Sequence, residues 1–129
     1  MTVQGFTFQN TGATPQNNGN CLSASEGAHL HIGNVVFQGC GQALAISNGG
    51  WIVGLITTTN CGYGVVVGNP GSAWQNPSVG TSAIGGASSS AGSGLFAYQG
   101  GVIDLVGGIT SVSSFSLGTA CSHGGFITY

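Results

Sequence analysis

Hydrophobic and polar positions alternate over short stretches of this chain, and glycine or asparagine interrupts them every few residues. Segments such as NVVFQGC, GLITTTNC and GYGVVVG are rich in β-branched residues, which favours strands of about three to seven residues. No segment has the apolar spacing of an amphipathic helix, and frequent glycines would weaken a helix. The pattern therefore predicts an all-β protein.

A short phrase recurs along the chain: a polar pair, one or two glycines and two bulky apolar residues. It occurs as SNGGWI, YQGGVI and SHGGFI, with a weaker copy SEGAHL and a degenerate copy that begins GNPG. The copies start at residues 25, 47, 68, 98 and 122, so their spacings are 22, 21, 30 and 24 residues. This repeat predicts a β-solenoid of about five coils of roughly 21–30 residues.

Two positions of the phrase predict columns of similar side chains along the stack. The sixth position is aliphatic and should point inward: Leu30, Ile52, Ala73, Ile103 and Ile127. The second position is polar and predicts a turn column, whose amides bond to the backbone or to the next coil. Its members are Glu26, Asn48, Asn69, Gln99 and His123. The glycines that follow allow the positive φ of a sharp corner.

Strand alternation places the fifth position of the phrase on the outer surface. Its members are His29, Trp51, Ser72, Val102 and Phe126. The seventh position shares that face, with His31, Val53, Asp104 and Thr128. An outward column that contains Trp, Phe and Val is unusual on a free monomer, so we expect it to be covered in an assembly.

The length of 129 residues predicts one domain, residues 1–129. Both ends have strand-like sequences, which favours a fragment of a longer chain. Two long spacers predict protruding loops at 11–20 and 72–94, because they are polar or low in complexity. We expect Trp74, in the second loop, to be the most exposed aromatic residue.

The charge of the chain limits the classes of partner that it could bind. It has 26 glycines, no Lys or Arg and only two acidic residues. Nucleic acids and anionic membranes attract basic side chains, so neither partner is expected. No apolar run reaches the roughly 20 residues of a membrane span, so no membrane insertion is expected, and the N-terminus does not resemble a signal peptide. Strongly acidic polysaccharides would bind poorly, which leaves neutral glycans.

Four segments carry a family resemblance: VQGFTFQN, GAHLHIGNVVFQGCGQALAI, GGWIVGLITTTNCGYGVVVG and GLFAYQGGVIDLVGGI. They resemble coils of the right-handed single-stranded parallel β-helix (pectin-lyase-like type) of bacteriophage tailspikes and tail fibres. The resemblance covers nearly the whole chain and lies in the repeated phrase and the strand ends, not in a catalytic motif. It implies a homotrimer in the virion tail, made in the host cytoplasm, that acts extracellularly on a bacterial surface polysaccharide.

The preferred interpretation is a structural and receptor-binding segment of a phage tail fibre or tailspike, which contacts bacterial surface glycan during host adhesion. Two alternatives stay open: a polysaccharide depolymerase (lyase or hydrolase) with catalytic residues mostly outside this segment, and a subunit of an extracellular filament. The candidates for stacking on sugar rings are Trp51, Tyr63, Trp74 and Tyr98. For Trp51 a chain–chain interface is the first interpretation and a sugar platform the second.

Few residues of this chain could act in catalysis. Glycoside hydrolysis uses two carboxylates about 5–9.5 Å apart, whereas we expect Glu26 and Asp104 to lie three coils, or about 14 Å, apart. No hydrolase serine motif is present, and the Lys or Arg that many lyases of this fold use is missing. The sequence therefore leaves enzymatic activity uncertain, identifies no catalytic residue and predicts no cofactor.

The histidines and cysteines also permit two interpretations each. His29 and His31 form an H-x-H pair that could bind iron or zinc at a trimer axis, but we favour two outward histidines without a metal. Of the four cysteines, Cys40 and Cys61 share a register on adjacent coils. A secreted chain would form disulfides; a phage protein folds in a reducing cytoplasm, so we favour reduced cysteines, Cys21 and Cys121 included.

Overall fold

The computed structural model describes residues 1–10, 19–77, 81–87, 92–105 and 109–129, and all regular secondary structure in these residues is strand. The strands are β1 (Thr2–Gln4), β2 (Thr7–Gln9), β3 (Asn20–Ala24), β4 (His29–Gln38), β5 (Gln42–Ile46), β6 (Trp51–Cys61), β7 (Tyr63–Gly68), β8 (Ala73–Gln75), β9 (Thr81–Gly86), β10 (Ser93–Tyr98), β11 (Val102–Asp104), β12 (Ile109–Ser113), β13 (Leu117–Ser122) and β14 (Phe126–Thr128). They stack as a parallel β-solenoid of about four turns, which confirms the predicted fold class with one coil fewer than expected. None of the described residues belongs to a helix long and apolar enough to cross a membrane.

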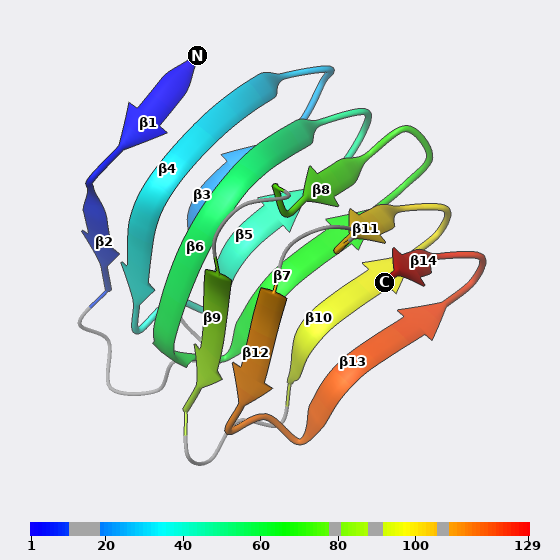
Figure 1. Cartoon of the computed structure of the whole chain (residues 1–129). Coiled ribbons are helices and arrows are strands. Elements are labelled where there is room, and N and C mark those ends of the chain that lie inside the picture. Colours follow the sequence, from blue (N-terminus) through cyan, green and yellow to red (C-terminus); the bar gives the residue numbers. More distant parts are fainter. Residues whose placement is uncertain (11–18, 78–80, 88–91, 106–108) are drawn as a thin grey trace.

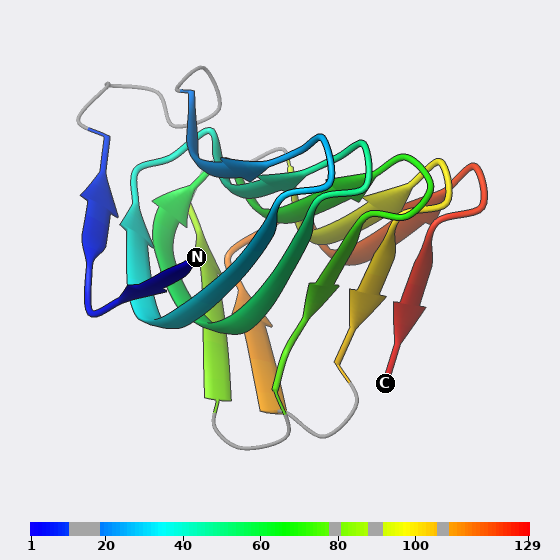
Figure 2. The ribbon, with the colours of Figure 1, turned by 90° about the horizontal axis from the view of Figure 1, so that it is seen from above.

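Two parallel sheets form the wall of the solenoid (Figure 1). The larger sheet has nine strands, in the order β1-β4-β6-β8-β11-β14, with β2 paired to β4, β9 to β6 and β12 to β9. The smaller sheet has five strands, in the order β13-β10-β7-β5-β3. Each full coil forms one strand of the smaller sheet, passes through a tight turn and continues into the larger sheet, so that successive coils lie side by side (Figure 2).

The tight turn between the two sheets has a left-handed polar residue followed by a left-handed glycine at five places, and at four of them the two residues are adjacent, as the repeated phrase predicts. Its polar residue has a φ between 47° and 69°, and the φ of the following turn glycine is also positive. The pairs are Glu26 and Gly27, Asn48 and Gly49, Asn69 and Gly71, Gln99 and Gly100, and His123 and Gly124. Two successive left-handed residues need glycine at the second position, because a Cβ there is unfavourable. The phrase recurs because four of the five corners contain this pair, and the third corner keeps the same two left-handed residue types with Pro70 between them.

Side chains of the turn column bond to one another along the stack. Asn69 Nδ2 donates a hydrogen bond to Asn48 Oδ1 at 2.8 Å, and Asn48 Nδ2 donates to Glu26 Oε1 at 3.5 Å. Within the second of these turns, Gly50 N donates to Ser47 O at 2.9 Å. The predicted bonding between coils is therefore present at three successive turns.

The inward column of the larger sheet contains four of the five predicted residues, with Trp74 in place of Ala73. The strand register aligns Leu30, Ile52, Trp74, Ile103 and Ile127. The prediction of Ala73 is wrong because Pro70 lengthens the preceding turn by one residue, between Asn69 and Gly71, and so shifts the next strand by one position. Trp74 and its two neighbours in the column are fully buried. Each such side chain contributes about 1.5–3 kcal/mol to stability.

The smaller sheet supplies the opposite side of the core. Its inward residues include Leu44, Val65 and Leu95, which align in register and have no exposed surface. At the N-terminal end of the stack the ring of Phe8 stacks on that of Phe37, with centroids 5.5 Å apart. Apolar side chains thus fill the space between the sheets along the stack.

The prediction of a protruding loop at 72–94 is wrong for much of that range. The range contains β8 and β9, which both pair with β6, and the first residues of β10. The small residues of β9 carry little strand signal but allow close contact between coils: a Cβ on Gly85 would lie 2.7 Å from Thr58 O. In the other predicted loop, 11–20, residues 11–18 lie outside the described residues, and β3 begins at Asn20.

Candidate functional site

The outer surface of the larger sheet carries an apolar column, as strand alternation predicts. This outer column consists of His29, Trp51, Ala73, Val102 and Phe126. Ala73 stands where Ser72 was predicted, again because Pro70 lengthens the turn before it. Ser72 is buried, and its hydroxyl accepts a hydrogen bond from Gly49 N at 3.0 Å. The outer column is therefore more apolar than the sequence alone indicates.

Trp51 has different neighbours on its two sides within the outer column. On one side the imidazole of His29 makes an edge contact with the indole, with ring centroids 5.1 Å apart and an interplanar angle of 83°. On the other side the next strand presents only the methyl group of Ala73. Trp51 keeps 38% of its surface exposed. The indole is thus supported from one side and little covered from the other.

A second outer column runs beside the first, two residues further along each strand. It consists of His31, Val53, Gln75, Asp104 and Thr128. Thr128 Oγ1 donates a hydrogen bond to Asp104 Oδ1 at 3.0 Å. Polar groups therefore share the outer surface with the exposed indole: Gln75 lies on the next strand and Asp104 on the strand after it. Apolar surface with a few polar groups is typical of ligand sites.

Trp74 is fully buried, so the prediction of an exposed, sugar-binding Trp74 is wrong. Its Nε1 donates to Gly54 O at 3.3 Å, which satisfies the one polar group of the indole inside the core. The same shift of one residue brings Gln75 to the outer surface, where sequence reasoning did not expect it. The signal was the extra residue in GNPGS relative to SNGG, which moves the positions of β8 by one.

Tyr63 and Tyr98 lie on the smaller sheet, at the start of β7 and the end of β10, and both are half-buried. The ring of Tyr98 stacks on that of Phe96, with centroids 5.4 Å apart and an interplanar angle of 19°. Trp51 belongs to the other sheet. The predicted sugar-binding aromatics therefore do not form one site, and a role for the two tyrosines stays a prediction.

The two carboxylates of the chain lie far apart within it. Glu26 is in the turn before β4, whereas Asp104 ends β11. Three strand steps separate β4 from β11 in the larger sheet, a rise of about 14 Å. That rise exceeds the roughly 5–9.5 Å that glycoside hydrolysis requires, so the two groups do not form such a pair within one chain.

His29 and His31 are both exposed on the outer surface of β4, as the sequence predicts. His29 packs on Trp51, whereas His31 pairs in register with Thr2 of β1. In the part of the chain that the structure describes, no three His, Cys, Asp or Glu side chains gather as metal ligands. His123 lies in the turn column with a φ of 47°.

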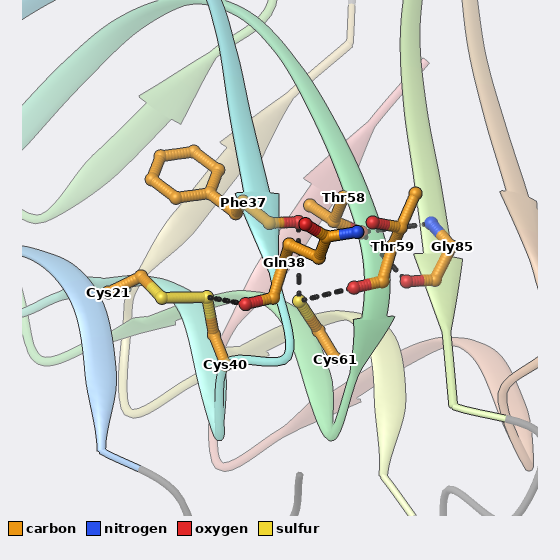
Figure 3. The surroundings of a disulfide bond; sticks show 8 residues. All are labelled: Cys21, Phe37, Gln38, Cys40, Thr58, Thr59, Cys61 and Gly85. Atoms are coloured by element: carbon orange, nitrogen blue, oxygen red, sulfur yellow. Dashed lines mark hydrogen bonds between the residues drawn. A yellow bond between two sulfur atoms is a disulfide. The ribbon is translucent and has the colours of Figure 1, made fainter. Parts of the chain in front are cut away.

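Cys21 and Cys40 form a disulfide, with Cα atoms 5.7 Å apart (Figure 3). The prediction of reduced cysteines is therefore wrong for this pair. Cys21 belongs to β3 and Cys40 lies at the corner before β5, so the bond links neighbouring coils. The signal was hard to find, because the two residues occupy different positions of the repeat and meet only through the corner.

Cys61 and Cys121 have free thiols, the first buried and the second exposed. Cys61 Sγ donates to Thr59 O at 3.4 Å and to Phe37 O at 3.7 Å, near the disulfide (Figure 3). Burial raises the pKa of the Cys61 thiol, although nearby backbone groups oppose the shift. A thiol held protonated in this way is a poor nucleophile.

No protein-family model, no curated protein and no solved structure matches this chain. The class that the structure establishes is a parallel β-solenoid protein with an apolar outer column beside a second, more polar one.

Proposed function

We propose that this chain is a structural and receptor-binding segment of a phage tail fibre or tailspike that contacts a neutral glycan on the bacterial surface. The observation that carries the proposal is Trp51, which stays 38% exposed on the outer sheet surface that also carries Gln75 and Asp104. A partly exposed indole offers a flat apolar face and a polar edge, a combination that suits a sugar ring.

The solenoid supports this role mechanically. Stacked coils keep their outer side chains at regular intervals of about 4.8 Å, and an extended repeat surface is the usual binding surface of solenoid proteins. Here the Cys21–Cys40 disulfide and the hydrogen-bonded turn column add links between coils. Such a wall holds recognition groups in place, so a ligand does not have to order them.

The charge of the chain favours a neutral ligand. Neither Lys nor Arg occurs anywhere in the sequence, so an anionic glycan would find no ammonium or guanidinium side chain to pair with. Asp104, beside the outer column, would repel a uronate or sulfate group. A neutral glycan rich in hydroxyl groups needs no cationic partner and is not repelled by Asp104.

Assembly into a homotrimer in the virion tail is part of the proposal. The C-terminal end of the outer column supports it, because Phe126 is 60% exposed. Large exposed apolar side chains mark interaction surfaces when they gather. Molecular mass in solution, measured by light scattering, tests it: three chains per particle are expected, whereas an open filament would grow with concentration.

Calorimetric titration with bacterial surface polysaccharides, neutral and acidic, tests the glycan proposal. Binding of a neutral polysaccharide with no binding of polygalacturonate is the expected result. New reducing ends or unsaturated products during the incubation would instead indicate a depolymerase. Absence of binding to every neutral polysaccharide would overturn the proposal.

A further inference from the structure

We infer that one neutral pyranose ring binds on a step in the outer surface of the larger sheet, an inference that rests on the proposed glycan recognition. The step consists of Trp51, Ala73 and Val102 of the outer column together with Gln75 and Asp104 of the second outer column. It assigns Trp51 to a saccharide and not to a chain–chain contact.

The shape of the step follows from the strand register. Trp51 and Val102 lie on strands that are two steps apart, with Ala73 on the strand between them. Two steps correspond to about 9.6 Å. Because Ala73 has only a methyl group, the outer surface falls between its larger neighbours. A pyranose ring seated above Ala73 would place its apolar C–H face against the uncovered side of the Trp51 indole.

His29 is the positioning residue of the step. Its imidazole packs against Trp51 in a T-shaped contact with a centroid distance of 5.1 Å, from the strand on the side away from Ala73. An exposed tryptophan without such a neighbour would lose rotamer freedom when a sugar binds, and this loss weakens binding. His29 reduces that loss because it holds the ring before the ligand arrives.

Gln75 and Asp104 supply hydrogen bonds for the hydroxyl groups of the sugar. Gln75 lies two residues after Ala73 on the same face, and Asp104 is its register partner on the next strand. A carboxamide both donates and accepts, whereas a carboxylate accepts at several positions. Thr128 holds one carboxylate oxygen of Asp104 at 3.0 Å, which fixes the orientation of that group.

The two tryptophans provide a direct measurement. Trp51 is 38% exposed and Trp74 is fully buried, so acrylamide quenches the fluorescence of Trp51 selectively. The methyl glycosides of glucose, galactose, mannose and N-acetylglucosamine serve as probes, and sodium glucuronate as the acidic comparison. At least one neutral glycoside should protect Trp51 from quenching with a dissociation constant of about millimolar order, and glucuronate should not.

Ala73→Phe fills the step, and Ala45→Phe, at a half-buried outward position of the smaller sheet, is its matched control. We expect Ala73→Phe and Trp51→Ala to weaken binding at least about tenfold, Gln75→Ala and His29→Ala about threefold to tenfold, and Ala45→Phe not at all. For Trp51→Ala, which lacks the reporter, calorimetry replaces fluorescence. Circular dichroism verifies that each variant is folded.

The outcomes separate the two proposals. Glycan binding that Trp51→Ala weakens but Ala73→Phe leaves unchanged would overturn the step and leave the proposed function standing. Glycan binding that neither variant weakens would overturn the step and also remove the observation that carries the proposed function. Wild-type protein that binds no neutral glycoside or polysaccharide would overturn both. A lower molecular mass of the Trp51→Ala variant would show that this residue joins chains, which also overturns the step.

Discussion

Trp74 lies directly beside Ile52 in the inward column, and its indole Nε1 donates to the carbonyl of Gly54 on the same neighbouring strand. We expect Trp74→Ala to lower the free energy of unfolding by about 3–5 kcal/mol, because it empties a fully packed site. Trp74→Phe should cost about 1–3 kcal/mol, since it leaves the Gly54 carbonyl without this donor. Urea unfolding followed by circular dichroism measures both, and Trp51→Ala is the control. Equal losses for the two Trp→Ala variants would contradict this placement.

Deletion of Pro70 tests why Trp74 points inward. Without Pro70 the turn has the same length as the SNGG turn, with Asn69 and Gly71 adjacent, and the following strand keeps its register. We expect the deletion to change the unfolding free energy by less than about 1 kcal/mol. Deletion of Ala73 is the matched control: it shortens the strand itself and turns Trp74 outward, since a slip of one residue exchanges the two faces.

Thermal unfolding of the two deletion variants gives the result. The Ala73 deletion should lower the midpoint by many degrees or prevent folding, whereas the Pro70 deletion should stay close to the wild type. A Pro70 deletion as damaging as that of Ala73 would show that the longer turn is required for another reason.

This turn also marks the limit of what the sequence predicts. Four members of the inward column and all five turn residues follow from the repeated phrase, because each corner uses a left-handed polar residue and a left-handed glycine. The degenerate copy at 68 contains one inserted residue, Pro70, which the repeated phrase does not reveal. Because side chains alternate between the two faces of a strand, an error of one residue exchanges the inward and outward positions of Ala73 and Trp74. The candidate site was therefore only half predicted: Trp51 was expected outside, whereas Ala73 and Gln75 beside it were not.

The prediction of a loop in the segment that forms β9 was wrong for a different reason. Its sequence, TSAIGG, has few large apolar residues, so local propensity favours a loop. The strand forms because its neighbours on both sides, β6 and β12, supply hydrogen bonds. The close approach of β6 also explains the glycine at position 85, where a larger residue would collide with Thr58 O. A strand that depends on tertiary contacts in this way is difficult to predict from local sequence propensity.

Asn48 tests the contribution of the turn column. Its φ is 49°, and its side chain accepts from Asn69 and donates to Glu26. Asn48→Gly keeps the left-handed backbone without strain but removes these bonds, so we expect a loss of up to about 1 kcal/mol. Asn48→Ala adds the cost of a left-handed residue with a Cβ, about 1–2 kcal/mol more. Urea unfolding compares the two variants, and equal stability would show that the corner is not strained by alanine.

The Cys21–Cys40 disulfide should contribute measurably to stability. It closes a loop with a sequence separation of 19 residues, for which restriction of the unfolded chain predicts about 2–4 kcal/mol. We expect the double variant Cys21→Ser, Cys40→Ser to unfold at a lower temperature than the oxidised wild type and to be insensitive to dithiothreitol. Peptide mapping of the non-reduced protein verifies the pairing. Wild-type protein whose unfolding temperature does not respond to the reductant would contradict the contribution.

The buried thiol of Cys61 predicts a loss of stability in alkali. Burial raises its pKa above the ordinary value of 9.0, and unfolding returns the pKa to that value. Between the two values the unfolded chain releases a proton that the folded chain keeps, so this contribution is complete below pH 9 and decreases as the pH rises through the folded pKa. In a Cys121→Ser background, which removes the exposed thiol, the free energy of unfolding should fall more steeply above pH 9 with Cys61 than with Cys61→Ala. Urea unfolding from pH 7 to pH 10.5 measures the two slopes, and parallel curves would show that the thiol ionises as easily inside the solenoid as in water.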